Sequence, residues 1–160
     1  LKDKNKVGDY ILPSAAIRGE GTSNDYFPPE VPALPAFNLQ RAVSSNIRDF
    51  GKDYWTGTVF TTNRRVWEHD EEFKRHLKAV RSIAIDMETV PLFTVGFHNA
   101  IPTGALLLVS DMPMHPEGIK TEESDKHVTQ NFVDEHLTIG IKAISSLQHN
   151  SRTIKHLRYE

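Results

Sequence analysis

The sequence has 160 residues, enough for about one domain. Its 19 Lys and Arg residues against 21 Asp and Glu residues give a formal net charge of -2 without a basic or acidic run, which indicates neither a nucleic-acid nor a membrane partner. Cysteine is absent, so disulfides, thiolate nucleophiles and cysteine metal sites are excluded, and no apolar run approaches the roughly 18 residues of a membrane span. With no signal peptide at the start of the chain, a cytoplasmic location is predicted.

The first part of the chain predicts a strand, a long loop and a helix. β-Branched and aromatic residues over 7–17 predict one or two strands interrupted at Pro13, and a loop rich in Gly, Pro, Ser and Asn follows over 18–35. Apolar residues at near-helical spacing predict a helix over 34–50, with Gly51 in the position of a C-cap.

Strands and helices then alternate. Strands are predicted at 53–62, 82–86 and 103–110, and helices at 67–80, 87–100 and 122–148. The last helix has a predicted core face of Phe132, Val133, His136, Leu137, Gly140, Ile141, Ile144 and Leu147. This order predicts an α/β protein with an at least partly parallel sheet, and no repeat or linker divides it.

Two of the predicted strands end in acidic residues. The run over 82–86 leads into Asp86, Met87 and Glu88, and the run over 103–110 leads into Ser110 and Asp111. Ligands of open α/β sheets bind beyond the carboxyl ends of strands, so Glu88 and Asp111 would face one cleft if the two strands are neighbours. The alternative is that Asp86 or Glu88 stabilises the first turn of the following helix and that Asp111 caps a turn.

Four blocks occur in an order and at a spacing typical of one family: "VGDY", "TGTVFTTNRRVWE", "AIDMET" and "LLLVSDMPM". On these blocks the chain resembles the AMP nucleosidases of the nucleoside phosphorylase superfamily, over nearly all of its length. The resemblance implies a three-layer α/β/α sandwich around a mixed, partly barrel-like sheet, assembled into hexamers. It also implies hydrolysis of the N-glycosidic bond of AMP to adenine and ribose 5-phosphate, as in nucleotide salvage, without a cofactor.

The resemblance also implies roles for three residues. Asp111 corresponds to the acid that protonates adenine N7, Glu88 to the carboxylate that binds the ribose hydroxyls, and Met87 to a methionine packed against the sugar. Protonation makes adenine a neutral leaving group, an effect typically worth ~10²–10⁴ in rate. Because carboxyl groups in water are ionised at neutral pH, a proton donor here requires an apolar, partly buried setting, which the residues around Asp111 are expected to supply.

Further candidate ligands come from the second block and from the loop. Trp67 is a candidate to stack on adenine, Asn63 to read its edge, and Arg64 or Arg65 to reach a phosphate, whereas the alternative places Trp67 in the core and both arginines in solvent. Arg18, before the Gly-rich loop, is a second candidate phosphate ligand, and Ser110 is a candidate substrate contact beside the acid. Lys120 and Lys126 would either act on Asp111 or be solvated.

A metal site is not predicted. His69, Glu72 and His76 lie close together in the sequence, but they lack the HExxH spacing and fall on a charged helix that we expect to face solvent.

The sequence also departs from the family pattern. Val90 and Pro91 replace the small residues usual after "DMET", and a proline is tolerated there only in the first helical turn. Only six residues precede "VGDY", so the chain is predicted to be the C-terminal portion of the catalytic domain, spanning 1–160. The alternatives are a purine nucleoside phosphorylase and a catalytically incomplete fragment with a binding or assembly role.

Overall fold

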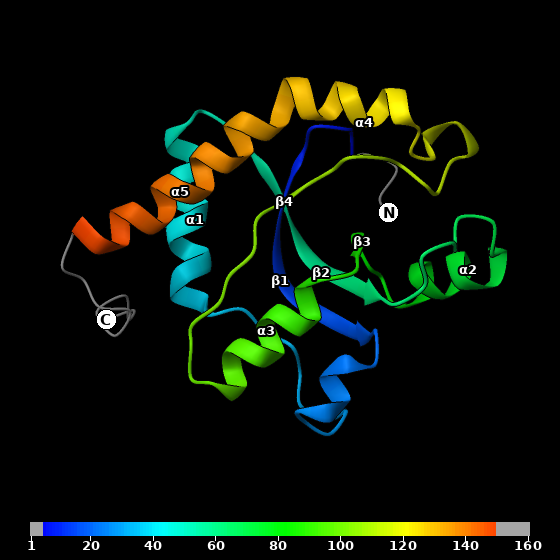
Figure 1. Ribbon diagram of the computed structural model, residues 1–160, viewed down its shortest axis with the longest axis horizontal. Helices are drawn as coiled ribbons and strands as arrows, with labels where there is room; N and C mark the ends of the chain where they lie inside the picture. The colour runs from blue at the N-terminus through cyan, green and yellow to red at the C-terminus, as the bar shows by residue number, and fades with distance from the viewer. Residues whose placement is uncertain (1–4, 150–160) are drawn as a thin grey trace.

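A four-stranded mixed sheet organises the fold, and the computed structural model describes residues 5–149 of it (Figure 1). The strands are β1 (Tyr10–Gly19), β2 (Tyr54–Thr62), β3 (Ala84–Asp86) and β4 (Leu107–Leu108). Their order is β3-β2-β1-β4; the first three are parallel, and β4 is antiparallel to β1. The sheet is therefore mixed, as predicted.

β1 is a single strand that passes through Pro13 instead of stopping there. Its register against β2 shifts between Pro13 and Ala15, so that Ser14 has no partner on β2 and forms a bulge. The bulge changes which residues share a face: Ile11 and Ala16, five positions apart, belong to the same buried cluster.

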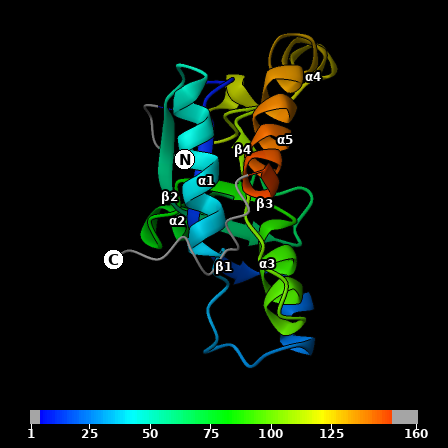
Figure 2. The ribbon, with the colours of Figure 1, turned by 90° about the vertical axis from the view of Figure 1, so that its left-hand side faces the viewer.

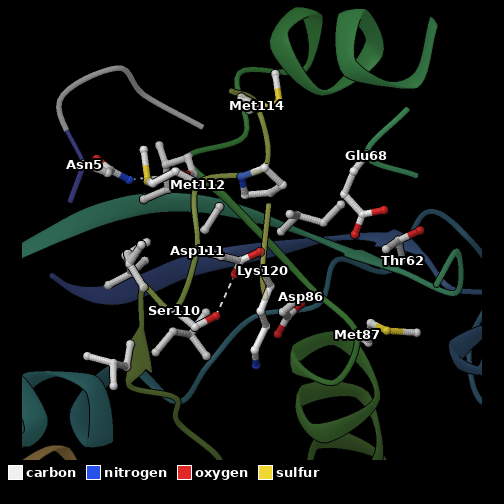
Figure 3. A pocket seen from close by; sticks show the side chains of 18 of the residues that line it. Asn5, Thr62, Glu68, Asp86, Met87, Ser110, Asp111, Met112, Met114 and Lys120 are labelled. Atoms are coloured by element: carbon white, nitrogen blue, oxygen red, sulfur yellow. Dashed lines mark hydrogen bonds between the residues drawn. The ribbon is translucent and has the colours of Figure 1, made fainter. Parts of the chain in front are cut away.

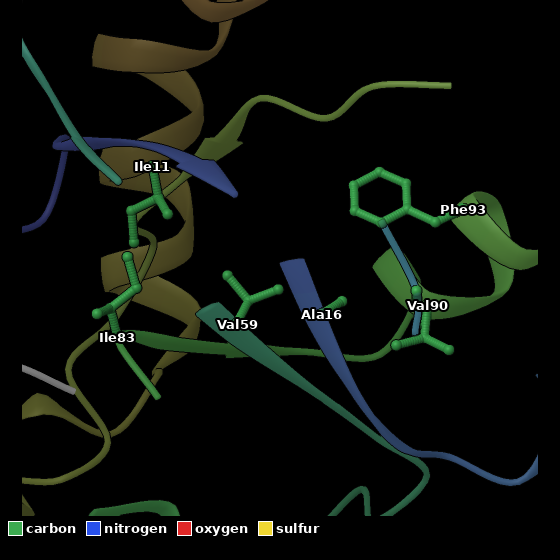
Figure 4. Packing of buried hydrophobic residues seen from close by; sticks show 7 residues of the cluster. Ile11, Ala16, Val59, Ile83, Val90 and Phe93 are labelled. Carbon is green, nitrogen blue, oxygen red and sulfur yellow. The ribbon is translucent and has the colours of Figure 1, made fainter. Parts of the chain in front are cut away.

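Helices cover both faces of the sheet. On one face, Tyr10 and Leu12 pack with residues of α1 (Phe37–Asp49) and α5 (Asp134–His149), which lie side by side (Figure 2). On the opposite face, Ile11 and Ala16 belong to the buried cluster drawn in Figure 4, which also includes Val90 and Phe93 of α3 (Thr89–His98). Alternate residues of one strand thus belong to buried clusters on opposite faces of the sheet.

A third buried cluster lies at the β3 side of the sheet. Phe60 of β2 packs there with Phe73 and Leu77 of α2 (Glu71–Ala79) and with Trp67. Phe60 lies on the same face of β2 as Tyr54, which packs on the α1 and α5 cluster, so α2 covers the same face of the sheet as those helices.

Local sequence signals explain the helix ends. Asp70 caps α2 by accepting a hydrogen bond from the Phe73 N–H at 2.9 Å. Gly51 follows α1 with φ +69°, and its N–H donates to the Arg48 carbonyl at 2.8 Å, so the predicted C-cap is confirmed. The loop predicted over 18–35 begins only after Gly19, because β1 continues to that residue, and it includes one short 3₁₀ helix, η1 (Thr22–Asp25).

The predicted helix over 122–148 is three consecutive elements, α4 (Glu122–Val128), a π-helical turn η3 (Thr129–Val133) and α5. Its predicted core face is wrong in part: Leu137, Ile141 and Ile144 are 55%, 64% and 58% exposed, whereas Ile139 and Ala143 are fully buried. α5 carries apolar residues on two faces, and periodicity alone does not distinguish the face that packs on β1 and α1.

Two other strand predictions were too long. Of the run over 103–110 only Leu107 and Leu108 pair as a strand, and the run over 82–86 pairs only from Ala84. A 3₁₀ turn, η2 (Pro116–Gly118), lies in the loop that connects β4 to α4. Within residues 5–149, no helix combines the length and the apolar character that crossing a membrane requires.

Candidate active site

One cleft of about 540 Å³ brings together the two acidic strand ends (Figure 3). This volume lies in the usual range for small-molecule sites. Its lining comes from 83–88, from 106–115, and from Asn5, Ile11, Thr62, Trp67, Glu68, Lys120 and His136.

The strands that carry these acids are not neighbours. β3 and β4 lie at opposite edges of the sheet, and β4 runs antiparallel to β1, so the sequence argument that placed Glu88 and Asp111 at one edge rested on a wrong strand order. The two residues nevertheless line the same cleft, because the segment that follows β4 passes along it.

Backbone hydrogen bonds on both sides fix the segment that carries Asp111. The Val109 N–H donates to the Asp9 carbonyl at 2.9 Å, and the Gly8 N–H donates to the Val109 carbonyl at 2.9 Å. After the acid, the Met112 N–H donates to the Gly118 carbonyl at 2.8 Å. The "VGDY" block therefore acts structurally, by anchoring the chain two residues before Asp111.

Asp111 is partly buried in a largely apolar part of the cleft. Met112, Pro113 and Met114 line the cleft beside it. Within the described residues, its carboxylate accepts one hydrogen bond, from the Ser110 hydroxyl to Oδ1 at 2.7 Å. Ser110 therefore contacts the Asp111 carboxylate, whose second oxygen, Oδ2, accepts no hydrogen bond from the described residues.

The two lysines considered as partners of Asp111 form ion pairs elsewhere. Lys120 lines the cleft, and its Nζ lies 2.7 Å from Asp125. Lys126 pairs with Glu122 at 2.7 Å on the surface of α4.

The turn from β3 to α3 presents Met87 and Glu88. Both are exposed and line the cleft, whereas the Asp86 carboxylate accepts hydrogen bonds from the Thr61 hydroxyl and the Thr89 N–H, at 2.7 and 2.9 Å. Of the two carboxylates that were candidates to stabilise the first turn of the helix, Asp86 does so.

The second block is divided between the core and the surface. Trp67 is 6% exposed and packs edge-on against Phe73, yet it also lines the cleft. Asn63 and Arg64 are exposed and are not among the residues that line the cleft; the Arg64 guanidinium pairs with Asp70 at 2.9 Å and lies 4.6 Å from the centre of the Phe73 ring.

Arg18 lies away from this cleft. Its guanidinium donates to the Ser23 and Asn24 side chains and to the carbonyls of Phe27, Pro28 and Val31 at 2.6–3.0 Å, which fastens the 18–35 loop. It lines a second cavity of about 110 Å³ beside α3.

The structure adds lining residues that the sequence did not suggest. Glu68 ends the second block, and its carboxylate accepts a hydrogen bond from the Trp67 N–H at 2.9 Å. His136, predicted as a core residue, lines the cleft and lies 2.8 Å from the Leu106 carbonyl through Nε2. Asn5 precedes the first block, and no local pattern marks it.

Tyr10 and Glu135, which are not among the residues that line the cleft, form a pair of ionisable groups with shifted pKa values. The Tyr10 hydroxyl donates to Glu135 at 2.7 Å, and Lys52 pairs with the same carboxylate at 3.0 Å. These hydrogen bonds lower the pKa of Glu135, and burial, reinforced by the carboxylate, raises the pKa of Tyr10 far above its usual range. Within residues 5–149, no three His, Asp or Glu side chains gather as metal ligands.

The α/β fold and the cleft between the turn after β3 and the segment after β4 define a phosphorylase-like protein. The chain belongs to the phosphorylase superfamily, whose family model matches residues 1–147. It is 61% identical to a solved AMP nucleosidase from Bacteroides thetaiotaomicron, with a TM-score of 0.79 over 92% of this chain and 59% of that one. The resemblance to AMP nucleosidases is therefore confirmed.

Other similar proteins are also nucleosidases or phosphorylases. The chain is 32% identical over 157 residues to the AMP nucleosidase of Escherichia coli K12, covering 92% of this chain and 32% of that protein, and 29% identical to the uridine phosphorylase of Treponema pallidum, covering 88% and 57%. A uridine phosphorylase structure from Vibrio fischeri is 21% identical with a TM-score of 0.76, covering 90% of this chain and 58% of that one.

The structural matches confirm the predicted nucleoside phosphorylase-like α/β fold, with a mixed sheet curled into a half-barrel. The chain spans about a third of the curated AMP nucleosidase and somewhat more than half of the solved one.

Proposed function

We propose that this chain supplies the base- and ribose-binding wall of a site that hydrolyses AMP to adenine and ribose 5-phosphate. The observation that carries the proposal is the shared cleft: Asp111, Met87 and Glu88 line one cavity of about 540 Å³ although they come from opposite edges of the sheet. The 61% identity to an AMP nucleosidase supports AMP as the substrate.

In the proposed reaction, Asp111 gives a proton to purine N7 as the bond from N9 to C1′ of the ribose breaks, and a water oxygen bonds to C1′. Adenine then leaves as a neutral molecule, and the proton that water loses balances the one that the acid gives. Protonation by a placed acid typically contributes ~10²–10⁴ in rate. The partly buried carboxylate beside Met112 and Met114 supports this role.

Glu88 is proposed to bind the ribose hydroxyls, with Met87 packed against the sugar. As the glycosidic bond breaks, the ribose gains oxocarbenium-like positive charge, which a nearby carboxylate stabilises. The exposure of both side chains at the turn after β3 supports this assignment.

The remaining candidate ligands have unequal support. Trp67 is proposed to contact the base through the part of its ring that lines the cleft, and Ser110 to orient Asp111. For Asn63, Arg64 or Arg18 to reach the nucleotide, the side chain would have to move into the cleft, and both arginines would have to give up the contacts they make now. Among the described residues that line the cleft, Lys120 is the one with a permanently charged cationic side chain, and it already pairs with Asp125. We therefore propose that groups outside the described residues also bind the phosphate.

Product analysis tests the reaction. Incubation of AMP with the protein, combined with the segment of the solved AMP nucleosidase that these 160 residues do not cover, is expected to yield adenine and ribose 5-phosphate in equal amounts. Formation of ribose 1-phosphate from a purine nucleoside, dependent on added phosphate, would instead identify a purine nucleoside phosphorylase.

The Glu88→Gln variant tests the ribose assignment. A hydrogen bond to a charged group contributes about 1.5–3 kcal/mol, so its loss should reduce the preference for AMP over 2′-deoxy-AMP by about tenfold or more. Comparison of kcat/KM for the two nucleotides measures this preference. An unchanged ratio would show that the carboxylate does not bind the 2′-hydroxyl.

A further inference from the structure

Glu88 stands at the N-cap position of α3, yet its side chain does not cap the helix. Its backbone has φ −127° and ψ −24°, which differs from the extended conformation of most N-cap residues, and its carboxylate makes no capping hydrogen bond. Among the described residues, that carboxylate accepts one hydrogen bond, from the Met87 N–H at 3.2 Å. The unpaired N–H groups of a helix start normally attract such a carboxylate.

Asp86 and Thr61 occupy the first two helix donors. The Thr89 N–H donates to Asp86 Oδ2 at 2.9 Å, and the Thr89 hydroxyl donates to the same oxygen. The Val90 N–H donates to Thr61 Oγ1 at 3.1 Å, while the Thr61 hydroxyl donates to Asp86 Oδ1 at 2.7 Å. Thr61, Thr89 and Val90 are at most 1% exposed, so solvent does not compete for these bonds.

Pro91 removes the third donor. It is the third residue of α3, the position whose N–H a capping side chain commonly binds, and proline has no N–H. The next N–H, of Leu92, already donates to the Glu88 carbonyl at 3.1 Å. No donor in the first turn of α3 therefore remains for the Glu88 carboxylate.

We propose that Asp86 and Pro91 keep the Glu88 carboxylate available for the ribose. Asp86 is a positioning residue: buried hydrogen bonds commit both of its oxygens to the turn, and it provides the negative charge favoured at a helix start. Because Pro91 has no backbone N–H, it offers the Glu88 carboxylate no competing hydrogen bond. The inference rests on the proposed function for the identity of the ligand and adds roles for two residues outside the proposed ligand set.

The Pro91→Ala variant tests the inference because it restores one N–H and removes no contact that the inference uses. In its crystal structure, we expect the Glu88 carboxylate to accept a hydrogen bond from the new N–H at position 91. In equilibrium nucleotide titrations of the protein combined with the segment of the solved AMP nucleosidase that these residues do not cover, the preference for AMP over 2′-deoxy-AMP should fall by about tenfold, toward that of Glu88→Gln. Leu92→Ala, at the next position and 56% exposed, adds no donor and is expected to keep the wild-type preference.

The Asp86→Asn variant tests the role proposed for Asp86. In this variant an NH₂ group replaces one of the two carboxylate oxygens, and it cannot accept the hydrogen bond that the oxygen accepted from Thr61 or Thr89. We expect the turn to loosen and the Glu88 carboxylate to bind the Thr89 N–H instead. The preference for AMP over 2′-deoxy-AMP should then fall as in Pro91→Ala. If this variant does not fold, Pro91→Ala alone decides. A folded Pro91→Ala protein with Glu88 unmoved and the preference unchanged would overturn the inference. If the wild-type protein, combined with the segment of the solved AMP nucleosidase that these residues do not cover, binds neither nucleotide, the proposed function fails, and the position of the Glu88 carboxylate in the variant crystal structure still decides the inference.

Discussion

At the scale of single residues, Asp111 is the group on which the proposed hydrolysis depends most. Asn is nearly the same size and still accepts the Ser110 hydrogen bond, but it has no proton to give to N7. We therefore expect Asp111→Asn to lower kcat by about 10²–10⁴ while AMP still binds. Adenine release and equilibrium binding measure the two effects, with Asp49→Asn, at the exposed end of α1, as the control. Near-wild-type turnover would exclude Asp111 as the acid.

The network of Tyr10, Glu135 and Lys52 predicts a pH-dependent stability. The pKa of Glu135 is lowered from its ordinary value of 4.5, chiefly by the Tyr10 hydrogen bond and then by Lys52. A carboxyl with a lowered folded-state pKa stabilises the fold above its unfolded pKa, and this contribution disappears as the pH falls through the folded value.

Glu135→Gln is accordingly expected to lower the free energy of unfolding by about 1 kcal/mol at pH 7. The difference from wild type should shrink as the pH falls below 4.5 and through the lowered pKa of Glu135. Urea denaturation of both proteins at several pH values measures it. A difference that stays constant over this fall in pH would contradict the assignment.

At the scale of elements, α5 offers a matched pair of isoleucines. Ile139 is fully buried between β1 and α1, and Ile141, two residues later, is 64% exposed. Ile139→Ala is expected to cost about 2–5 kcal/mol through the cavity it leaves, and Ile141→Ala about 0.5 kcal/mol or less. Chemical denaturation of the two variants compares them directly. Equal losses would mean that α5 packs through the face that the sequence predicts.

At this scale, the sequence predicts features that depend on neighbouring residues and does not predict features that depend on distant segments. The alternation of strands and helices was predictable because β-branched runs and Gly51 act on their own neighbours, whereas the helix predicted from 67 begins only at Glu71, after its cap Asp70. The opposite-edge placement of β3 and β4 was not, because pairing between distant segments leaves no local mark. The π-helical turn η3 likewise has no sequence signal that periodicity detects.

The same distinction applies to the candidate site. Asp111 and Glu88 were found because each closes an apolar run within a recognisable block, and they do line one cleft. Glu68 and His136 were missed as lining residues because only the folded chain brings them there. The roles of all of these residues remain predictions.

At the scale of the whole molecule, we propose that the described chain forms one wall of a larger site. It spans 59% of the solved AMP nucleosidase, and large apolar side chains such as Phe97 and Ile101 are 67% and 60% exposed. Exposed apolar surface of this kind marks contacts with other protein segments. We therefore propose that further chain and other subunits, in the predicted hexamer, cover these surfaces.

The 160-residue chain alone is accordingly expected to release adenine from AMP extremely slowly. Positioning of the reactants can contribute ~7–11 kcal/mol to a rate, and an acid on one side of the sugar does not replace the groups that position water on the other. Adenine release by the purified 160 residues, with and without the segment of the solved relative that they do not cover, measures the difference. Turnover equal to that of the completed enzyme would show that the site is complete within 1–160.

The bulge at Ser14 determines where β1 tolerates a change in length during evolution. Because Ser14 has no partner on β2, losing it would leave Ile11 and Ala16 on the same face and would only straighten the strand. Losing Leu12, with the bulge kept, would instead exchange the inner and outer faces of the residues before it, and Tyr10 and Ile11 would trade their helical layers. Single-residue deletions among homologues should therefore gather at this one position of the strand.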